Sequence, residues 1–313
     1  MTALVPVGKL IPLRAGVDPI SRSTRQPGLS HFTHPLGTVA FTGAGGSCLS
    51  LGPPTCAAAH QATVARAFVA AHPGAAFFYV TRAQLDAMGL AAHTQLPVGT
   101  DLVLPLPLSD VPETARSALR KATRQGLTLE EPIALAPLAA ELRSVQERYL
   151  STRAVTTELH FLNRPCEFEA ETDARTFVLR QRGAMIGFVV LDEYVTAEGG
   201  RGLLLNMFRL APTKLWNVYQ AVVLLLAEHL AGEGLDELSL GFVPLTAPGE
   251  PLAWWLRVQH AALRWAGRRS TYLQRLGVIK HGFAARSVTR YLSTPRKLIV
   301  KDVRAFIAAM SGA

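Results

Sequence analysis

The order of strand-like and helical segments in the second half of the chain constrains the fold more than any other feature of this sequence. Two stretches of alternating apolar residues meet at QRGA (181–184), which predicts a β-hairpin. A third strand-like stretch follows at 201–210, then an apolar helical stretch at 214–234 that ends in glycine, and then a fourth strand at 236–245. The predicted order is therefore strand, turn, strand, strand, helix, strand.

That order is the one found in the acyltransferase fold of the N-acetyltransferase superfamily, abbreviated GNAT. The first part of the chain predicts short strands within 37–52, a helix over 54–74, a strand over 75–80, a short helix capped by Thr81 and a strand over 101–108. This alternation indicates a smaller α/β unit. We predict an α/β (α+β) protein of tandem GNAT-like folds, whose mixed central sheets are flanked by helices. The predicted organisation is a flexible N-terminal arm over residues 1–35, a first GNAT-like unit over 36–108, and a second over 109–313 that carries the active site.

The charge of the chain points to a polyanionic partner. The 313 residues include 32 Lys and Arg against 23 Asp and Glu, a net charge of +9, and 49% of them are hydrophobic, enough for a full core. Most of the cations are arginine, whose planar guanidinium makes bidentate contacts with phosphate or carboxylate. RNA, an anionic lipid surface and a phosphorylated ligand all fit this charge, and so does an ordinary basic protein from an Arg-rich, Ala-rich proteome.

Cysteine and hydropathy patterns indicate the compartment. Cys48, Cys56 and Cys166 lack the CxxC spacing of a metal knuckle, so we expect no metal site and reduced thiols in a cytoplasmic protein. The N-terminal sequence lacks the continuous apolar core of a signal peptide. The most apolar run, AVVLLLAEHLAG, is about half of the roughly 20 residues that a membrane span needs. We expect a cytoplasmic protein without a membrane span, with peripheral contact at the inner membrane face.

A row of cations marks the stretch ARSALRKATRQG (115–126). Start signals at 109–112 and the glycine at 126 predict a helix here. The spacing puts these residues on one helical face: Arg116, Arg120 and Arg124, with Lys121 beside them. Like charges four residues apart destabilise an isolated helix by about 0.2–0.5 kcal/mol per pair, and a bound polyanion would offset this. The alternative is a solvated face with local Glu or Asp partners.

The turn before the long helix lacks the feature that acetyl-CoA users need. In those enzymes a glycine-rich turn lets backbone N–H groups and the helix N-terminus hold the pyrophosphate. Here the turn reads LAPTKLWNVYQ (210–220) and contains no glycine, while Pro212 removes one donor and Trp216 is bulky. The sequence therefore indicates either a different activated acyl donor or no chemistry at all.

Five stretches of the chain together resemble one family. In order they are LSLGPP (49–54), ARSALRKATRQG (115–126), FVLRQRGAMIGFVVL (177–191), LSLGFVPL (238–245) and IKHGFAARSVTRYL (279–292). They are similar to stretches in the soluble domain of phosphatidylglycerol lysyltransferases and their stand-alone relatives, over about residues 36–295. The resemblance implies a tandem acyltransferase fold that uses aminoacyl-tRNA as donor. It also implies an architecture similar to that of the Fem-type peptidyltransferases of cell-wall synthesis.

One stretch of this chain differs from the corresponding family motif at an important position. The family has SVDLMRY where the chain reads LLNMFRL (204–210), so that Arg209 is kept and the family aspartate is Asn206. Both family positions are implicated in handling the amino-acid end of the donor. Asparagine accepts a hydrogen bond but brings no charge, so lysine is not assumed as the amino acid. Residues three apart in a strand point to opposite faces unless a bulge intervenes.

The resemblance implies three groups of site residues. The catalytic residues implied are Asn206, Arg209 and Lys280. The implied substrate-binding residues are Phe208, Tyr219, Gly241, Arg286 and Arg290. The implied tRNA-binding residues are Arg116, Arg120, Lys121 and Arg124.

The resemblance also implies the reaction. The expected enzyme is an aminoacyltransferase that moves an amino acid from charged tRNA to the hydroxyl or amine of a lipid or small-molecule acceptor, with no cofactor and no metal. Two alternatives stay open. One is a CoA-dependent N-acyltransferase, against which the glycine-free turn argues, and the other is a non-catalytic relative that binds RNA or a membrane.

Overall fold

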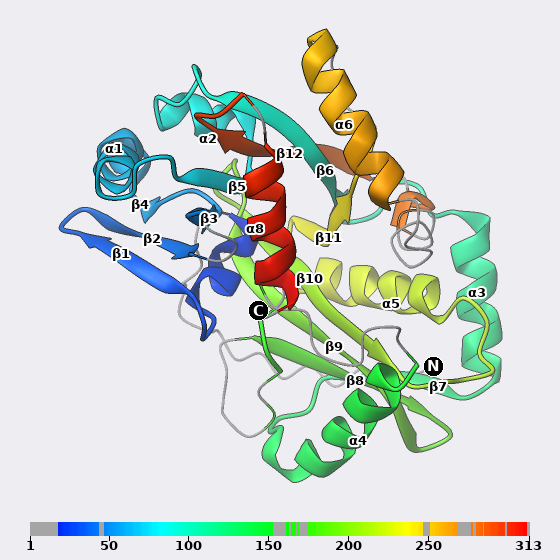
Figure 1. Cartoon of the computed structure of the whole chain (residues 1–313). Helices are drawn as coiled ribbons and strands as arrows, with labels where there is room; N and C mark the ends of the chain where they lie inside the picture. Colours follow the sequence, from blue (N-terminus) through cyan, green and yellow to red (C-terminus); the bar gives the residue numbers. More distant parts are fainter. Residues whose placement is uncertain are drawn as a thin grey trace.

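The structure, a computed structural model, describes residues 18–311 apart from 44–46, 153–160, 163, 167, 169–173, 247–250, 268–276, 278–279, 284 and 298. Twelve strands of this part of the chain form one mixed sheet flanked by helices (Figure 1). The earlier strands are β1 (Ser30–His34), β2 (Gly37–Thr42), β3 (Leu49–Leu51), β4 (Thr55–Cys56), β5 (Ala76–Val80) and β6 (Thr94–Pro105). The later strands are β7 (Leu127–Glu130), β8 (Arg175–Gln181), β9 (Ala184–Val195), β10 (Arg201–Leu210), β11 (Glu237–Pro244) and β12 (Arg286–Thr294).

The sheet runs through both halves of the sequence without a break. Its order is β1-β2-β3-β5-β12-β6-β11-β10-β9-β8-β7, and β4 pairs with β2. Strand β12 lies antiparallel between β5 and β6, although it is the last strand in sequence. The predicted division after residue 108 therefore coincides with no gap in the hydrogen bonding, and the unit boundaries stay a prediction. Of the predicted arm, residues 1–17 lie outside the described residues, and the rest includes the 3₁₀ helix η1 (Pro19–Arg25) and β1.

The predicted order of elements in the second half is confirmed. Strands β8 and β9 form the hairpin, β10 follows, and the helix α5 (Val218–Gly232) leads into β11. The hairpin turn has positive φ at both Arg182 (51°) and Gly183 (87°), the backbone of a two-residue turn whose twist matches the flanking strands. The fold is thus a mixed α/β sheet flanked by helices, with the GNAT-like order of elements around β8–β11.

Helices cover the two faces of this part of the sheet. On one face α3 (Glu113–Arg124) packs against α5, and the small buried side chains of Ala115, Ala118 and Ala122 allow the two helices to approach closely. On the other face α4 (Ala139–Leu150) buries Leu142 and Val145. The remaining helices are η3 (Ala58–His60), α1 (Gln61–Ala71), α2 (Arg82–Ala87), η4 (Ala136–Leu138), α6 (Trp254–Gly267) and α8 (Val300–Ser311).

Two details differ from the segments expected from sequence. The helix expected over residues 54–74 begins only at Gln61, because Thr55–Cys56 pair with β2 and Ala58–His60 form a 3₁₀ turn. The strand expected at 101–108 starts earlier, at Thr94, and lies inside the sheet between β12 and β11. Among the described residues, no helix has both the length and the apolar character to cross a bilayer.

Candidate active site

A fork between β10 and β11 forms the centre of the candidate site. The two strands pair in parallel over three residue pairs, from Gly202–Glu237 to Leu204–Ser239, and both run on beyond that point. Just past it each strand is irregular, since β10 shifts register against β9 between Leu205 and Met207. Strand β11 shifts against β6 between Ser239 and Gly241. Beyond Leu204 and Ser239 the two strands no longer pair with each other, so the backbone N–H and C=O groups that face the fork form no β10–β11 ladder.

The bulge in β10 places Asn206 and Arg209 on the same face of the sheet. Leu205 lies opposite Leu191 and Met207 lies opposite Val190, so Asn206 is the extra residue. Arg209 Nε donates to Gln146 Oε1 on α4 (3.2 Å), and the guanidinium lies 4.8 Å from the Tyr149 ring centroid. The sequence pattern of a regular strand would have separated the two residues, and the bulge brings them to the α4 face.

Asn206 is held by a buried carboxylate of the neighbouring strand. Its Nδ2 donates to Asp192 Oδ2 (2.7 Å) and to Ser23 Oγ of η1 (3.1 Å). Asp192 is fully buried and also accepts from Arg164 (2.9 Å), with Arg22 Nε at 3.6 Å. Because Asp192 can only accept, the asparagine amide is fixed with its nitrogen toward it. Within the described part of the chain, Asn206 Oδ1 is buried and receives no hydrogen bond.

Lys280 lies on the other side of the fork. Its side chain is buried, and Nζ donates to the carbonyl oxygen of Phe242 (3.3 Å). Burial lowers the pKa of Lys280 to about 8, while the Asp101 carboxylate acts in the opposite direction. About a tenth of a lysine with that pKa is neutral at pH 7, so it can accept a proton near neutral pH.

Gly241 lies between β10 and Lys280, with a backbone conformation that favours glycine. Its φ is +77°, and a Cβ built there would lie 3.4 Å from the Leu205 carbonyl oxygen and 3.6 Å from Lys280 Nζ. Gly241 and Lys280 therefore meet next to the bulge that contains Asn206. The fork thus brings together a residue of β10, a residue of β11 and a buried amine near neutral pKa.

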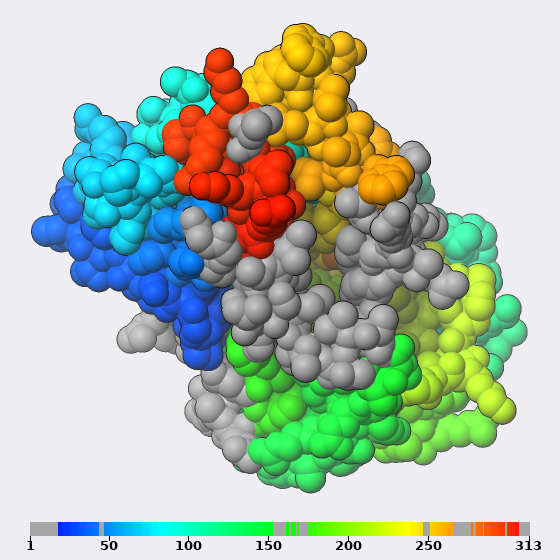
Figure 2. Space-filling view, viewed as in Figure 1, coloured from blue at the N-terminus to red at the C-terminus, as the bar shows by residue number. Residues whose placement is uncertain are grey.

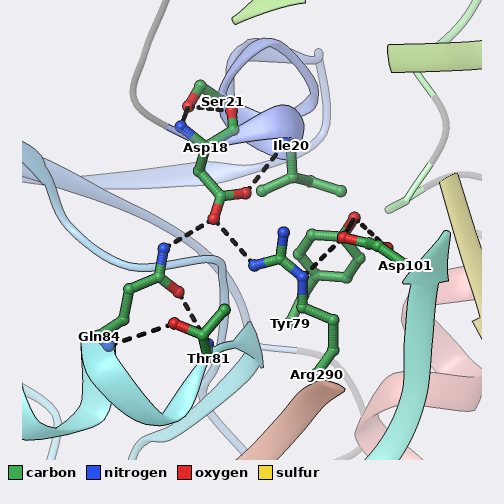
Figure 3. A network of polar contacts seen from close by, with 8 residues as sticks. All are labelled: Asp18, Ile20, Ser21, Tyr79, Thr81, Gln84, Asp101 and Arg290. Atoms are coloured by element: carbon green, nitrogen blue, oxygen red, sulfur yellow. Dashed lines mark hydrogen bonds and ion pairs between the residues drawn. The ribbon is translucent and has the colours of Figure 1, made fainter. Parts of the chain in front are cut away.

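Arg290 belongs to a buried polar network that ties several elements together (Figure 3). Its Nε donates to Asp101 of β6 (2.7 Å) and its Nη1 to Asp18 (2.9 Å), just before η1. Its guanidinium lies 4.3 Å from the centroid of the Tyr79 ring, and the Tyr79 hydroxyl donates to Asp101 (2.7 Å). Burial and the adjacent carboxylate raise the pKa of Tyr79, which keeps it a neutral donor. Two protein carboxylates thus engage Arg290.

The other implied substrate-binding residues make contacts of their own. Phe208 and Tyr219 pack together on the α5 face, with ring centroids 5.3 Å apart, opposite the face that carries Asn206. Arg286, about half exposed, donates to Glu237 Oε2 (2.7 Å). Glu237 also accepts from the Tyr194 hydroxyl (2.6 Å). Gly241 is therefore the implied substrate-binding residue that lies at the fork with the catalytic set.

The four implied tRNA-binding residues are all exposed on α3, opposite its buried alanines. Arg120 donates to Glu113 (2.5 Å) and Arg116 lies 4.0 Å from it, so this acid partly neutralises the start of the helix. Lys121 Nζ lies 4.9 Å from the centroid of the half-exposed Trp216 ring. The basic face of α3 therefore adjoins the turn that replaces the phosphate cradle.

One cluster among the described residues has the composition of a metal site. Glu131, His229 and Glu233 place ligand atoms within 4.8 Å of one another. Arg175 already bridges both carboxylates, with contacts of 2.6 Å to Glu131 and 2.5 Å to Glu233. A metal ion would have to displace this guanidinium, and the cluster fits an ion-pair network between β8 and α5 better.

Sequence reasoning missed the carboxylates that organise the site. Asp192 and Asp101 each occupy an inward-facing position of a central strand, where an apolar residue is the rule. An aspartate at such a position was the signal in the sequence, because a charged group is almost never buried without a partner and therefore marks a polar site inside the protein. The partners of Asp192, which are Arg164 and Arg22, carry no local signal, since tertiary folding alone brings them to it.

Comparison with known proteins gives a consistent assignment. The family profile described as phosphatidylglycerol lysyltransferase, C-terminal, matches residues 10–294. A search of curated proteins returns no match. L-PGS from Bacillus licheniformis superimposes with a TM-score of 0.79 at 16% identity, over 95% of this chain and 93% of that one. The C-terminal domain (DUF2156) of a putative lysylphosphatidylglycerol synthetase from Agrobacterium fabrum gives 0.75 at 19% identity, over 91% and 89%.

A more distant structure shares the fold. A conserved protein of unknown function from Bacteroides thetaiotaomicron gives a TM-score of 0.53 at 13% identity, over 88% of each chain. At such identities the solved structures bear on the fold alone, whereas the profile match extends over most of the sequence. The chain belongs to the family of phosphatidylglycerol lysyltransferase C-terminal domains, and it is an enzyme of the acyl- and aminoacyltransferase type.

Proposed function

We propose that the protein transfers an amino acid from charged tRNA to the hydroxyl or amine of a lipid or small-molecule acceptor. The observation that carries this proposal is the fork between β10 and β11, where the buried amine of Lys280 lies beside Gly241 and the bulge at Asn206. A base whose pKa lies near neutral pH, placed beside the fork between two strands, suits acyl transfer. The acyl group and its nucleophile must meet where a proton can be removed from the nucleophile.

The proposed step needs no covalent enzyme intermediate, because the aminoacyl ester is already activated. The acceptor loses a proton from its O–H or N–H bond to neutral Lys280 and attacks the ester carbonyl carbon. The C–O bond to the tRNA ribose then breaks, and the ribose oxygen takes up the proton from the Lys280 ammonium. Backbone N–H groups of the diverging strands would stabilise the oxyanion.

Two features favour tRNA over CoA as the donor. The turn before α5 contains no glycine, and Asn217 at the start of the helix has a φ of 51° and no side-chain cap. Beside it stand the exposed cations of α3 and the half-exposed Trp216, a combination that suits phosphates and a stacked base. Transfer of radiolabelled amino acid from charged tRNA, abolished by RNase, tests this donor. A rise in melting temperature with acetyl-CoA would instead favour the CoA alternative.

The environment of Asn206 favours an amino acid without a cationic side chain. Asn206 brings no carboxylate of its own, and the carboxylate of Asp192 beside it is already engaged by Arg164 and by the Asn206 amide. A lysyl or arginyl side chain would find no free carboxylate in this group, whereas the α-ammonium that every aminoacyl donor carries needs only the Oδ1 acceptor of Asn206. A screen of all charged tRNAs with a lipid extract as acceptor is expected to show transfer of a neutral or acidic residue. Preferred transfer of lysine would contradict this assignment.

Replacing Asn206 with alanine is expected to lower transfer about 10- to 100-fold. The substitution removes the free Oδ1 acceptor, which we assign to the α-ammonium of the donor, and a hydrogen bond to a charged group is worth about 1.5–3 kcal/mol. The control is Ser23→Ala, which removes the other partner of the Asn206 amide and leaves Oδ1 in place. Equal losses in both variants would assign Asn206 a purely structural role.

The basic face of α3 gives a salt-dependence prediction. Replacing Lys121 and Arg124 with glutamine is expected to reduce the slope of log Kd for tRNA against log salt by about 1 per cation. The matched control is Arg116→Gln, since Arg116 lies beside Glu113 and contributes less free charge. Filter binding of tRNA between 50 and 200 mM salt measures the slopes, and unchanged slopes would remove α3 from the tRNA surface.

A further inference from the structure

Helix α6 carries an exposed apolar stripe with tryptophan at both ends. Trp254, Val258 and Trp265 are 71%, 62% and 61% exposed, and the exposed Ala261 lies between them. These positions are spaced by four, three and four residues, so they form one line along a single face of the helix. The helix projects from the upper edge of the molecule, apart from α3 and α4 (Figures 1 and 2).

The opposite face of α6 already holds the helix on the protein. Leu256 and Leu263 pack against the core cluster that includes Phe78 and Leu292. Gln259 donates to the Lys297 carbonyl oxygen (3.1 Å) and accepts from the Ile299 backbone N–H (3.1 Å) at the start of α8. The exposed stripe lies on the side of α6 that is turned away from these contacts.

The charged residues of the segment that contains the stripe are all basic. Arg257 and Arg264 are exposed and lie beside it on the helix. The sequence from 251 to 301 contains eleven of the 32 basic residues and none of the 23 acidic ones. The rest of the chain has 21 basic and 23 acidic residues, so the net charge of +9 comes from this one segment.

We propose that α6 docks the protein on an anionic lipid bilayer, with the Trp254–Val258–Trp265 stripe at the headgroup level and the arginines on lipid phosphates. A helix that presents tryptophan on one side and arginine beside it matches an interfacial helix. A second copy of the chain would bring one basic segment against another. Single-stranded RNA fits the stripe less well, because Trp254 and Trp265 stand about 16 Å apart on the helix with aliphatic residues between them.

The docking surface adds to the proposed function, because the bilayer would supply the lipid acceptor. In this one respect the inference rests on the proposed function. Docking through α6 would hold the protein at the bilayer surface, where a lipid acceptor is found. Vesicle binding is measured without tRNA or transfer. A wild-type protein that transfers to a soluble acceptor but does not bind anionic vesicles would refute the docking surface alone. Vesicle binding by a wild-type protein that transfers nothing would refute the proposed function alone.

The first experiment measures binding to vesicles by co-sedimentation. The vesicles contain phosphatidylcholine with 30% phosphatidylglycerol, and phosphatidylcholine alone serves as the uncharged comparison. The variant with Trp254→Ser and Trp265→Ser is expected to bind the anionic vesicles roughly 100-fold more weakly, about tenfold per ring. The variant with Arg257→Gln and Arg264→Gln is expected to bind the anionic vesicles about fivefold more weakly per charge removed. Its binding should also depend less on salt concentration than that of the wild type. Trp216→Ser, an exposed tryptophan near α3, is the control and should bind as wild type.

The second experiment locates the stripe in the bilayer. The chain has four tryptophans, at 216, 254, 255 and 265, so single-tryptophan variants with phenylalanine at the other three positions are feasible. Brominated phosphatidylglycerol is expected to quench the fluorescence of Trp254 in one variant and to leave Trp216 in the other unquenched. Equal quenching of both, or none at saturating vesicles, would overturn the proposal. Two other results would also overturn the proposal, if the stripe substitutions left vesicle binding unchanged. Loss of binding to an oligouridine would assign the stripe to RNA, and a changed sedimentation coefficient would assign it to a second copy of the chain.

Discussion

Lys280→Met is expected to lower kcat/KM for aminoacyl transfer by about 10²- to 10⁴-fold, the usual contribution of a general base. In the wild-type enzyme only the neutral amine accepts a proton, and the pKa of Lys280 is about 8. The rate should therefore rise about tenfold per pH unit below pH 8 and level off above it. The measurement is the pH profile of single-turnover transfer, corrected for spontaneous ester hydrolysis.

The same substitution is expected to stabilise the fold at pH 7. Burial depresses the pKa of Lys280 from 10.5 to about 8, so between these values the unfolded chain binds more protons than the folded one. The free energy of unfolding of the wild-type protein therefore rises with pH across that window, and the methionine variant should lack the rise. Below pH 8 the variant gains up to about 3 kcal/mol, because each pKa unit corresponds to about 1.4 kcal/mol.

A chemical rescue experiment tests whether Lys280 accepts the proton itself or only positions neighbouring groups. Lys280→Ala leaves space where the amine was, and added methylamine should restore part of the lost rate, with a dependence on the pKa of the amine supplied. A lysine that merely orients its neighbours through Phe242 would show no such dependence. An unchanged pH profile in the methionine variant would remove Lys280 from the proton transfer.

Arg290→Met is expected to destabilise the fold by about 3–5 kcal/mol, the second large effect. The substitution leaves the buried carboxylates of Asp101 and Asp18 without their shared cation. Arg286→Met, four residues earlier on the same strand, is the matched control. It removes a half-exposed ion pair with Glu237 and should change the free energy of unfolding by less than about 1 kcal/mol. Urea unfolding followed by tryptophan fluorescence measures both.

A second substitution tests whether the loss comes from unpaired charge. Adding Asp101→Asn to Arg290→Met should recover part of the stability, because one of the orphaned carboxylates becomes neutral. Asp101 also helps to keep Lys280 protonated, so Asp101→Asn alone should move the midpoint of the pH–rate profile below 8. Additive losses in the double variant would show that Arg290 acts by packing rather than by charge.

Much of the fold could be predicted from the sequence. The hairpin at 181–184, the strand at 201–210 and the helix predicted at 214–234, which the structure places at Val218–Gly232, follow from local periodicity and turn chemistry. The exposed basic face of α3 followed as well, because its alanines and arginines alternate with helical spacing. These features needed no knowledge of distant contacts.

Tertiary structure alone decided the composition of the site. The bulge that turns Asn206 and Arg209 to one face depends on the pairing of β10 with β9, which no pattern within residues 201–210 encodes. The burial that lowers the pKa of Lys280, and the partners of Asp192, come from segments far away in sequence. Periodicity records which face of an element is apolar, whereas register, burial and charge pairing arise only when several elements pack together.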